Sequence, residues 1–214
     1  MSGSSPGSGA ALLRRLRTPA APPHDACALC GVQLPSEHRH LADVERRALA
    51  CCCGACAMLF DRPGAAGGRF RSLPNRVLVD PDHRLDAAVW AALGIPVGTA
   101  FVLRDAAQDR AVLFYPSPAG ATESQADDDA WRNLRQATRL AGLLEPSVEA
   151  LLLRRDGDRV DCYLVPVDAC YELVGRMRLH WHGFDGGSVA RSELDAFFGR
   201  LADRAHHLAA RESA

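Results

Sequence analysis

Cysteine spacing constrains this chain more than any other feature of its sequence. Six of its eight cysteines lie between positions 27 and 56, and four of them form two Cys-x-x-Cys pairs. The pairs are Cys27–Cys30 and Cys53–Cys56, with 22 residues between Cys30 and Cys53. Two such pairs at this separation are typical of a tetrahedral four-thiolate metal site that orders a small ribbon. The spacing therefore predicts metal binding by Cys27, Cys30, Cys53 and Cys56.

Other side chains near the two pairs leave the ligand set open. Cys51 is close enough in sequence to replace a member of the second pair. His38 and His40 lie between the pairs, so a mixed site with a histidine ligand, or a second metal on spare thiolates, stays an alternative. Without a role in metal binding, Cys51 and Cys52 would be small buried apolar residues, and the two histidines would lie in a solvated turn.

The identity of the metal is predicted from the ligand type. Four thiolates suit Zn²⁺, and they also suit iron, as a single rubredoxin-type ion or as a cluster. Gly31 follows the first pair, where it lets backbone amides point at the sulfurs, but Ala57 follows the second pair. The missing second glycine weakens the rubredoxin interpretation, because amides directed at both pairs help to set the potential of such an iron. Zinc is therefore the expected cofactor and iron the alternative.

The chain is predicted to have four consecutive parts. Residues 1–25 are rich in Gly, Ser, Pro and Ala and are expected to be a disordered tail. Residues 26–60 form the metal-binding ribbon, and residues 61–75, dense in Gly and Pro, are a linker. Residues 76–210 alternate apolar strand hairpins with helices. The predicted fold class is α+β, with a small zinc-ribbon or rubredoxin-like module before a larger domain whose sheet is mostly antiparallel.

Local patterns predict individual elements in the larger domain. Apolar stretches flank short turns within 100–116 and within 148–167, which predicts two hairpins. Residues 117–126 are polar and are expected to form a loop. The stretch 177–181 is expected to be another strand. The last segment, 192–211, has an apolar residue every three or four positions and is expected to be an amphipathic helix.

The charge balance argues against several function classes. The formal net charge is −1, and all 25 cationic side chains are arginine. Nothing in the overall charge therefore favours nucleic acid or a membrane surface as a partner. No apolar run approaches the ~20 residues that cross a bilayer, and the first residues lack the order of a secretory signal. We expect a cytoplasmic protein that binds no membrane, with nucleic acid disfavoured.

No catalytic residue is predicted, because no catalytic motif stands out. Asp80 and Asp82 could imitate an acid–base site, but a proline-containing turn with a capping aspartate explains them equally well. His180 and His182 would share one face of the predicted strand, with no third ligand nearby in sequence. Whether the chain is an enzyme stays open, and a non-catalytic role is favoured.

Three motifs stand in order along the Cys-rich segment: C-x-x-C-G, then E-H-R-H, then C-x-C-x-x-C-A-x-L-F. They fall on Cys27, Cys30 and Gly31, on Glu37 to His40, and on Cys51, Cys53, Cys56, Ala57, Leu59 and Phe60. In these motifs, and in a further stretch at 165–187, the chain resembles the DUF5947 family. This family consists of uncharacterised proteins, mostly from actinobacteria, whose genes lie beside those of uptake nickel–iron hydrogenases. The resemblance spans most of residues 26–205.

The resemblance implies an accessory role around hydrogenase assembly or electron transfer, with a hydrogenase subunit or maturation factor as the partner. The leading hypothesis is a non-catalytic metal-binding accessory protein, whose structural zinc orders a segment too small to fold alone. A rubredoxin-like iron electron carrier and a zinc-ribbon nucleic-acid-binding protein are the alternatives. The apolar segment 57–60 is expected to dock the ribbon onto the larger domain, or alternatively to contact a partner.

Overall fold

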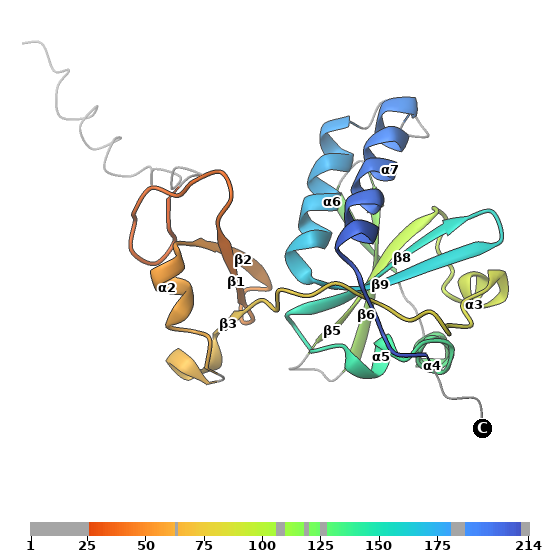
Figure 1. Ribbon diagram of the computed structural model, residues 1–214, viewed down its shortest axis with the longest axis horizontal. Helices are drawn as coiled ribbons and strands as arrows, with labels where there is room; N and C mark the ends of the chain where they lie inside the picture. Colours follow the sequence, from red (N-terminus) through yellow and green to blue (C-terminus); the bar gives the residue numbers. More distant parts are fainter. Residues whose placement is uncertain are drawn as a thin grey trace, which may run out of the picture.

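Two β-sheets organise the chain, a small one near its start and a large one after it (Figure 1). The computed structural model describes residues 26–62, 64–105, 110–117, 120–124, 128–180 and 187–210. The fold is α+β with a mostly antiparallel large sheet, which confirms the predicted fold class. Within these residues, every helix is too short or too polar to span a membrane.

The small sheet organises the Cys-rich segment. Its strands lie in the order β2-β1-β3, and both neighbouring pairs are antiparallel. The strands are β1 (Arg39–Asp43), β2 (Ala48–Cys52) and β3 (Phe70–Ser72), accompanied by helix α2 (Gly54–Met58) and the 3₁₀ turn η1 (Ala65–Gly68). Strand β3 falls within 61–75, the range expected to be a linker, and it pairs with β1. We therefore define the Cys-rich module as residues 26–72.

Seven strands form the large sheet in the order β10-β4-β9-β8-β5-β6-β7. They are β4 (Leu78–Val79), β5 (Thr99–Asp105), β6 (Arg110–Ser117), β7 (Gly120–Ser124), β8 (Glu149–Asp156), β9 (Arg159–Pro166) and β10 (His206–His207). Strands β10 and β4 pair in parallel, and the other neighbours pair in antiparallel fashion. The hairpins β5–β6 and β8–β9 lie where apolar stretches around a short turn predicted them.

The loop predicted at 117–126 is wrong, because β7 occupies part of it and pairs with β6. The hydroxyl of Thr122 donates to the hydroxyl of Ser117 at 2.9 Å across this pair. Strand β7 lies at the edge of the sheet. An edge strand can be short and polar, since much of it faces solvent. Its sequence therefore lacks the apolar stretch by which the strands of the two hairpins were predicted.

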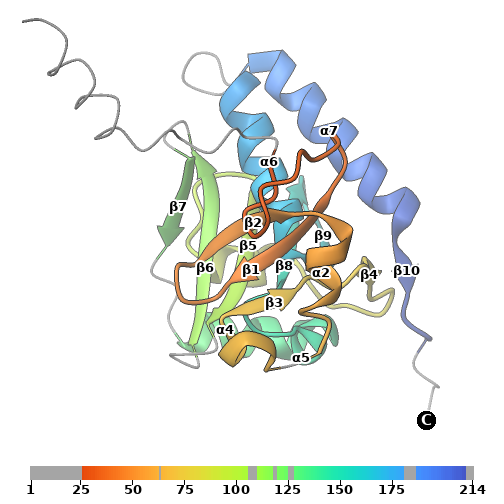
Figure 2. The same cartoon turned by 90° about the vertical axis from the view of Figure 1, so that its left-hand side faces the viewer.

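Helices cover both faces of the large sheet (Figures 1 and 2). On one face lie α3 (Ala87–Ala92), α4 (Asp128–Ala137) and α5 (Leu140–Leu143), and on the other lie α6 (Val167–His180) and α7 (Gly187–Arg204). Strand β8 buries Leu151 and Leu153 with the first group of helices. It buries Ala150 and Leu152 with the second group. Burial on both faces explains why β8 reads as a continuous apolar run.

The strand predicted at 177–181 is wrong where the structure describes it, because residues 177–180 are the last turn of α6. Leu173 and Met177 are four residues apart, and both are buried in the core between α6, α7 and the sheet. This spacing places them on one face of a helix. Trp181 and His182 lie outside the described residues. His180 therefore lies at the end of a helix, and not on the strand face that it was predicted to share with His182.

The helix predicted at 192–211 ends earlier than expected, at Arg204. His206 and His207 form β10 beside β4 instead of continuing the helix. The His206 N–H donates to the Val77 carbonyl at 2.8 Å, so the chain exchanges helical hydrogen bonds for sheet hydrogen bonds at this point. Strand β10 thereby forms one edge of the large sheet.

Polar contacts fix the Cys-rich module against the larger domain. The hydroxyl of Tyr171, on α6, donates to the Arg47 carbonyl at 3.1 Å. The Arg47 guanidinium also forms a salt bridge with Asp105, at the end of β5. From β3, the Arg71 guanidinium donates to the Pro146 carbonyl at 2.6 Å. These contacts join the β1–β2 turn and β3 of the module to α6, to β5 and to the segment before β8.

Candidate metal centre

Two tight turns carry the four cysteines of the predicted site. In the first turn, the Gly31 N–H donates to the Cys27 carbonyl at 2.8 Å. Gly31 has a φ of 76°, a conformation that glycine adopts without steric cost. The Cys27 N–H donates to the Val32 carbonyl at 2.8 Å and closes the turn. This local folding brings Cys30 back beside Cys27.

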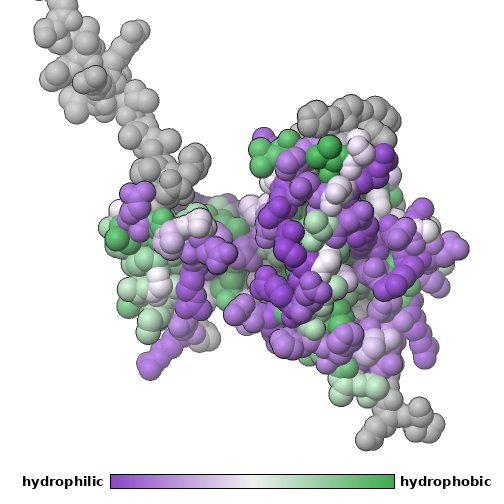
Figure 3. Space-filling model, turned by 45° about the horizontal axis from the view of Figure 1, so that its top comes forward, coloured by the Kyte–Doolittle hydropathy of each residue, from purple (hydrophilic) through white to green (hydrophobic). Residues whose placement is uncertain are grey.

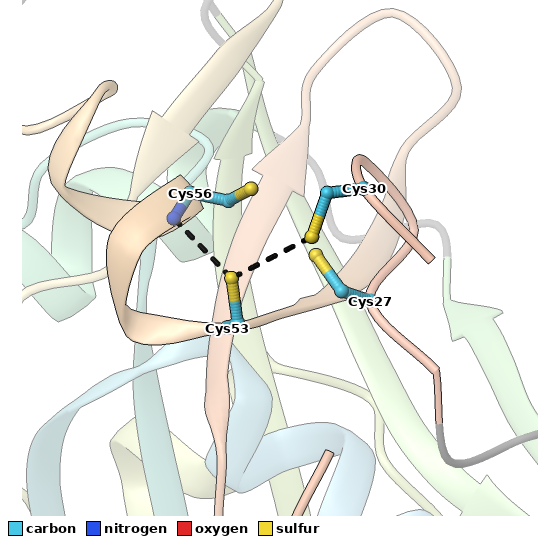
Figure 4. A group of neighbouring side chains, drawn as sticks. All are labelled: Cys27, Cys30, Cys53 and Cys56. Carbon is cyan, nitrogen blue, oxygen red and sulfur yellow. Dashed lines mark hydrogen bonds between the residues drawn. The ribbon is translucent and has the colours of Figure 1, made fainter. Parts of the chain in front are cut away.

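The second pair of cysteines is placed by the start of α2. Cys53 is the N-cap residue of this helix, and its Sγ accepts a hydrogen bond from the Cys56 N–H at 3.4 Å. The Ala57 N–H donates to the Cys53 carbonyl at 2.9 Å. An N-cap side chain lies over the amides of the first helical turn. The cap therefore keeps Cys53 and Cys56 together on the side that faces the first turn (Figure 4).

The four sulfurs converge on a common centre (Figure 4). The Sγ atoms of Cys27, Cys30, Cys53 and Cys56 all lie within 4.8 Å of one another. Those of Cys30 and Cys53 are 3.8 Å apart. That separation equals the edge of a tetrahedron whose metal–sulfur bonds are about 2.3 Å long, as in zinc–thiolate sites. These four cysteines could therefore hold a metal ion.

The thiols of Cys27 and Cys56 differ in how readily they lose a proton. Burial raises the pKa of Cys27, but hydrogen bonds from the backbone N–H groups of Cys53, Cys30 and Leu29 outweigh it and lower the pKa to about 6. Hydrogen bonds with the Cys53 and Cys30 thiols raise the pKa of Cys56 to about 12. Neighbouring thiolates repel one another, so a cation at the centre is what allows all four to ionise together.

Little apolar core supports the Cys-rich module. Among its described residues, the large aliphatic side chains that are buried are Leu34 and Leu41. Phe60 and Phe70 pack beside them, partly buried, with ring centroids 5.5 Å apart. A unit with so few buried side chains is stable only with an additional staple, such as a metal ion or support from a neighbouring domain. An ion bound by the four sulfurs would link the two turns on either side of the β1–β2 pair and so stabilise the module.

The alternative ligands lie apart from the four cysteines. Among the described residues, His38, His40 and Cys51 form a second group, with donor atoms within 4.8 Å of one another and no member in common with the first. Cys52 belongs to neither group. Burial, and then the charge of neighbouring sulfurs, raises the pKa of Cys52 to about 11, and its thiol donates to the Arg39 carbonyl at 3.3 Å. Cys52 is thus a protonated core residue.

One residue beside the histidines was not foreseen from the sequence. Asp168, in the first turn of α6, places Oδ2 3.2 Å from Nδ1 of His40. The two residues are 128 positions apart, and no local pattern connects them. A metal-ligand histidine commonly has a carboxylate on its other ring nitrogen. Nothing in the sequence therefore indicated that Asp168 lies beside His40; only the general rule that a ligating histidine has a carboxylate partner could have suggested such a residue.

Apolar side chains are exposed on both turns that carry the cysteines. Met58 and Leu59 are 68% and 69% exposed, so the prediction that segment 57–60 docks the module onto the larger domain is wrong for these two residues. Leu29 and Val32, on the first turn, are also exposed. Figure 3 shows green, hydrophobic surface on this part of the molecule. The alternative, in which this segment contacts a partner, stays a prediction.

Acidic partners neutralise several arginines of the module. The Arg69 guanidinium donates to the Asp43 carboxylate at 2.7 Å and lowers its pKa, and Arg46 lies 4.0 Å from the same carboxylate. Arg47 pairs with Asp105 of the larger domain. Nucleic-acid binding depends on cations that are available to phosphates. These ion pairs therefore weaken the nucleic-acid alternative.

The acidic run near residue 80 stabilises the fold. Asp80 is 1% exposed, and its carboxylate accepts from the Arg139 backbone N–H at 2.8 Å and from its Nε at 2.9 Å. Burial raises the pKa of Asp80, but these hydrogen bonds outweigh the effect of burial and lower the pKa to about 2. Asp86 caps α3 by accepting from two backbone N–H groups. A carboxyl group with so low a pKa is a poor general acid near neutral pH.

The fold and the converging sulfurs define a class: an α+β protein with a small Cys-rich module whose four cysteines could hold a metal ion. The chain belongs to the DUF5947 family, a family of unknown function, whose model matches residues 26–205. The match covers the module and all of the larger domain except β10. Neither the curated proteins nor the solved structures compared with the chain show a match.

Proposed function

We propose that the protein is a non-catalytic accessory protein in which Cys27, Cys30, Cys53 and Cys56 hold a structural Zn²⁺. In this proposal the Cys-rich module presents a surface to a protein partner, a subunit or maturation factor of a nickel–iron hydrogenase, in the cytoplasm. The observation that carries the metal part is the convergence of four sulfurs, with one pair at the tetrahedral separation of 3.8 Å. The hydrogenase part follows from the gene neighbourhood that the family resemblance implies.

A structural role for the metal follows from where the site lies. The sulfurs come from two turns that are separated by the β1–β2 pair, so one ion would cross-link the segments before and after this pair. All four ligands would be protein atoms, which is typical of structural zinc sites. Zinc is favoured over iron because Ala57, within α2, follows the second pair where a rubredoxin-type site would have glycine.

A partner surface beside the metal is supported by the exposed side chains on the two turns. Met58 and Leu59 stand on α2, next to the second pair of cysteines. Exposed apolar side chains that are held by a rigid local scaffold are favourable anchors for a protein partner. The metal would therefore contribute to partner binding indirectly, because it fixes the turns that carry these side chains.

Elemental analysis with a visible spectrum tests the metal part. The full chain would be expressed in medium replete in iron and zinc and purified under reducing conditions. We expect colourless protein with stoichiometric zinc. Stoichiometric iron with thiolate-to-iron absorption would instead favour the rubredoxin-like electron carrier. Protein with neither metal would contradict both interpretations.

A tagged full chain, expressed in a host that makes a nickel–iron hydrogenase, tests the partner part. We expect wild type to retain a hydrogenase subunit or maturation factor, and Met58→Ser/Leu59→Ser to lose it with unchanged metal content. Leu179→Ser is the matched control, because Leu179 is 78% exposed but lies on α6, away from the metal turns. Equal recovery by all three proteins, or no recovery of these partners by wild type, would contradict the proposal.

A further inference from the structure

A second group of metal-ligand side chains lies on the module, apart from the four cysteines. His38, His40 and Cys51 have donor atoms within 4.8 Å of one another, and the two imidazole centroids are 4.8 Å apart. The β1–β2 ladder places Cys51 directly opposite His40. His38 precedes His40 by two residues, and this spacing favours the same face of the strand. The hairpin backbone thus brings three ligand side chains together.

Hydrogen bonds determine which nitrogen of each imidazole is free. Nδ1 of His38 lies 2.9 Å from the Pro35 carbonyl oxygen. Nδ1 of His40 lies 3.2 Å from a carboxylate oxygen of Asp168. Carbonyl and carboxylate oxygens accept hydrogen bonds, so each Nδ1 carries the proton. In the neutral form of each ring, Nε2 is then the nitrogen that keeps a lone pair and can bind a metal.

One of these nitrogens has no partner. Nε2 of His38 is shielded from solvent, and within the described part of the chain no group forms a hydrogen bond with it. A buried acceptor left unpaired costs about 1–3 kcal/mol, and native proteins satisfy nearly all such atoms. A metal ion shared with His40 and Cys51 would supply the missing partner. This unpaired atom is evidence independent of the clustering of the three residues.

We propose that His38, His40 and Cys51 form a second site, which binds a divalent transition metal of the Zn²⁺ type through two Nε2 atoms and one thiolate. Imidazole and thiolate ligands together suit this class of ion. On binding, the Cys51 thiol releases its proton to solvent and the sulfur forms the third bond to the metal. Asp168 is a positioning residue, because its carboxylate holds the tautomer and orientation of His40.

The second site differs from the four-cysteine site in having an open position. Both histidines line a cleft of about 450 Å³ between the module and the larger domain. Arg39 and Arg204 line the same cleft. Sites with three protein ligands and one solvent position are typical of metals that react with or exchange a ligand. With three protein ligands, the second site leaves one coordination position for water or a small donor ligand.

Metal counting on the full chain tests this site. Reduced protein would be stripped of metal, saturated with Co²⁺ and passed through a gel-filtration column before elemental analysis. We expect two ions on wild type and one on His38→Ala/His40→Ala. The matched control is His206→Ala/His207→Ala, which removes the exposed histidine pair of β10 and should keep two ions. Far-UV circular dichroism would verify that each variant is folded.

A gentler variant tests the geometry without removing a ligand. Asp168→Asn should weaken Co²⁺ binding at the second site about 10–100-fold and leave the first ion unaffected. Unchanged affinity in Asp168→Asn would overturn the positioning role of Asp168. A wild-type chain that binds only one Co²⁺ at saturation would overturn the second site. A double histidine variant that binds two ions, or none, would overturn it as well.

Discussion

The buried carboxylate of Asp80 gives the sharpest stability prediction. It joins the end of β4 to α5, because it accepts hydrogen bonds from the backbone and the guanidinium of Arg139 and lies 3.3 Å from the Thr138 hydroxyl. Asp80→Asn keeps the shape of the side chain but removes the charge that Arg139 faces. Breaking one side of a buried ion pair is costly, because the other charge stays in place without compensation. We expect Asp80→Asn to destabilise the larger domain.

The magnitude follows from the pKa of Asp80, which falls from 3.8 to about 2 on folding. A shift of that size corresponds to about 2 kcal/mol of stability near neutral pH. The folded pKa is the lower one, so the contribution is complete above the unfolded pKa and is lost as the pH falls through the folded pKa. The stability gap between wild type and Asp80→Asn should therefore narrow by about 1 kcal/mol from pH 6 to pH 3.

Urea denaturation followed by tryptophan fluorescence measures this gap. Trp90, Trp131 and Trp181 all lie beyond the Cys-rich module, so the signal reports on the larger domain. Asp82→Asn is the matched control, since Asp82 meets the same guanidinium at 3.3 Å but is 34% exposed, and it should cost less than about 1 kcal/mol. An equal gap at pH 6 and pH 3, or equal losses in the two variants, would refute the reasoning.

Three further predictions concern the core, the ligand set and a second buried ion pair. Leu152→Ala should cost about 3 kcal/mol in urea denaturation, because Leu152 is fully buried between the sheet and α6 and α7. Cys53→Ser should lose the tightly bound metal in elemental analysis, whereas Cys52→Ser should keep it, although the two residues are adjacent. Glu149→Gln should cost about 3 kcal/mol in the same denaturation assay, because the buried Glu149 carboxylate accepts from Arg76 at 2.7 and 2.8 Å.

The two turns that carry the cysteines could be anticipated because the placement within each pair is local. Each Cys-x-x-Cys pair is held by its own turn, and Gly31 after the first pair signals a turn that requires a positive φ. The convergence of the two pairs depends on contacts between distant residues, and it was predicted from the spacing typical of metal sites. The hairpins β5–β6 and β8–β9 were visible because apolar stretches flank a short turn in each.

The second group of ligands could not be derived in the same way. Bringing Cys51 to His40 requires the register of the β1–β2 pair, and bringing Asp168 to His40 requires the docking of the module onto α6. Both depend on contacts between residues that are distant in sequence. The error at 177–181 has a related cause, because a short apolar run fits a strand or a buried helical turn equally well. Met177 is helical in the structure, because it lies one turn after Leu173 and is buried in the same core.

Hydrogen exchange of the full chain tests the central claim most directly, namely that four cysteines hold one ion and that this ion orders the module. The measurement compares wild type with Cys27→Ser/Cys56→Ser, both in reducing buffer. We expect the variant to lose protection at amides of β1 and β2 while β8 and β9 stay protected. Unchanged protection of β1 and β2 in the variant, with metal content equal to that of wild type, would contradict the account.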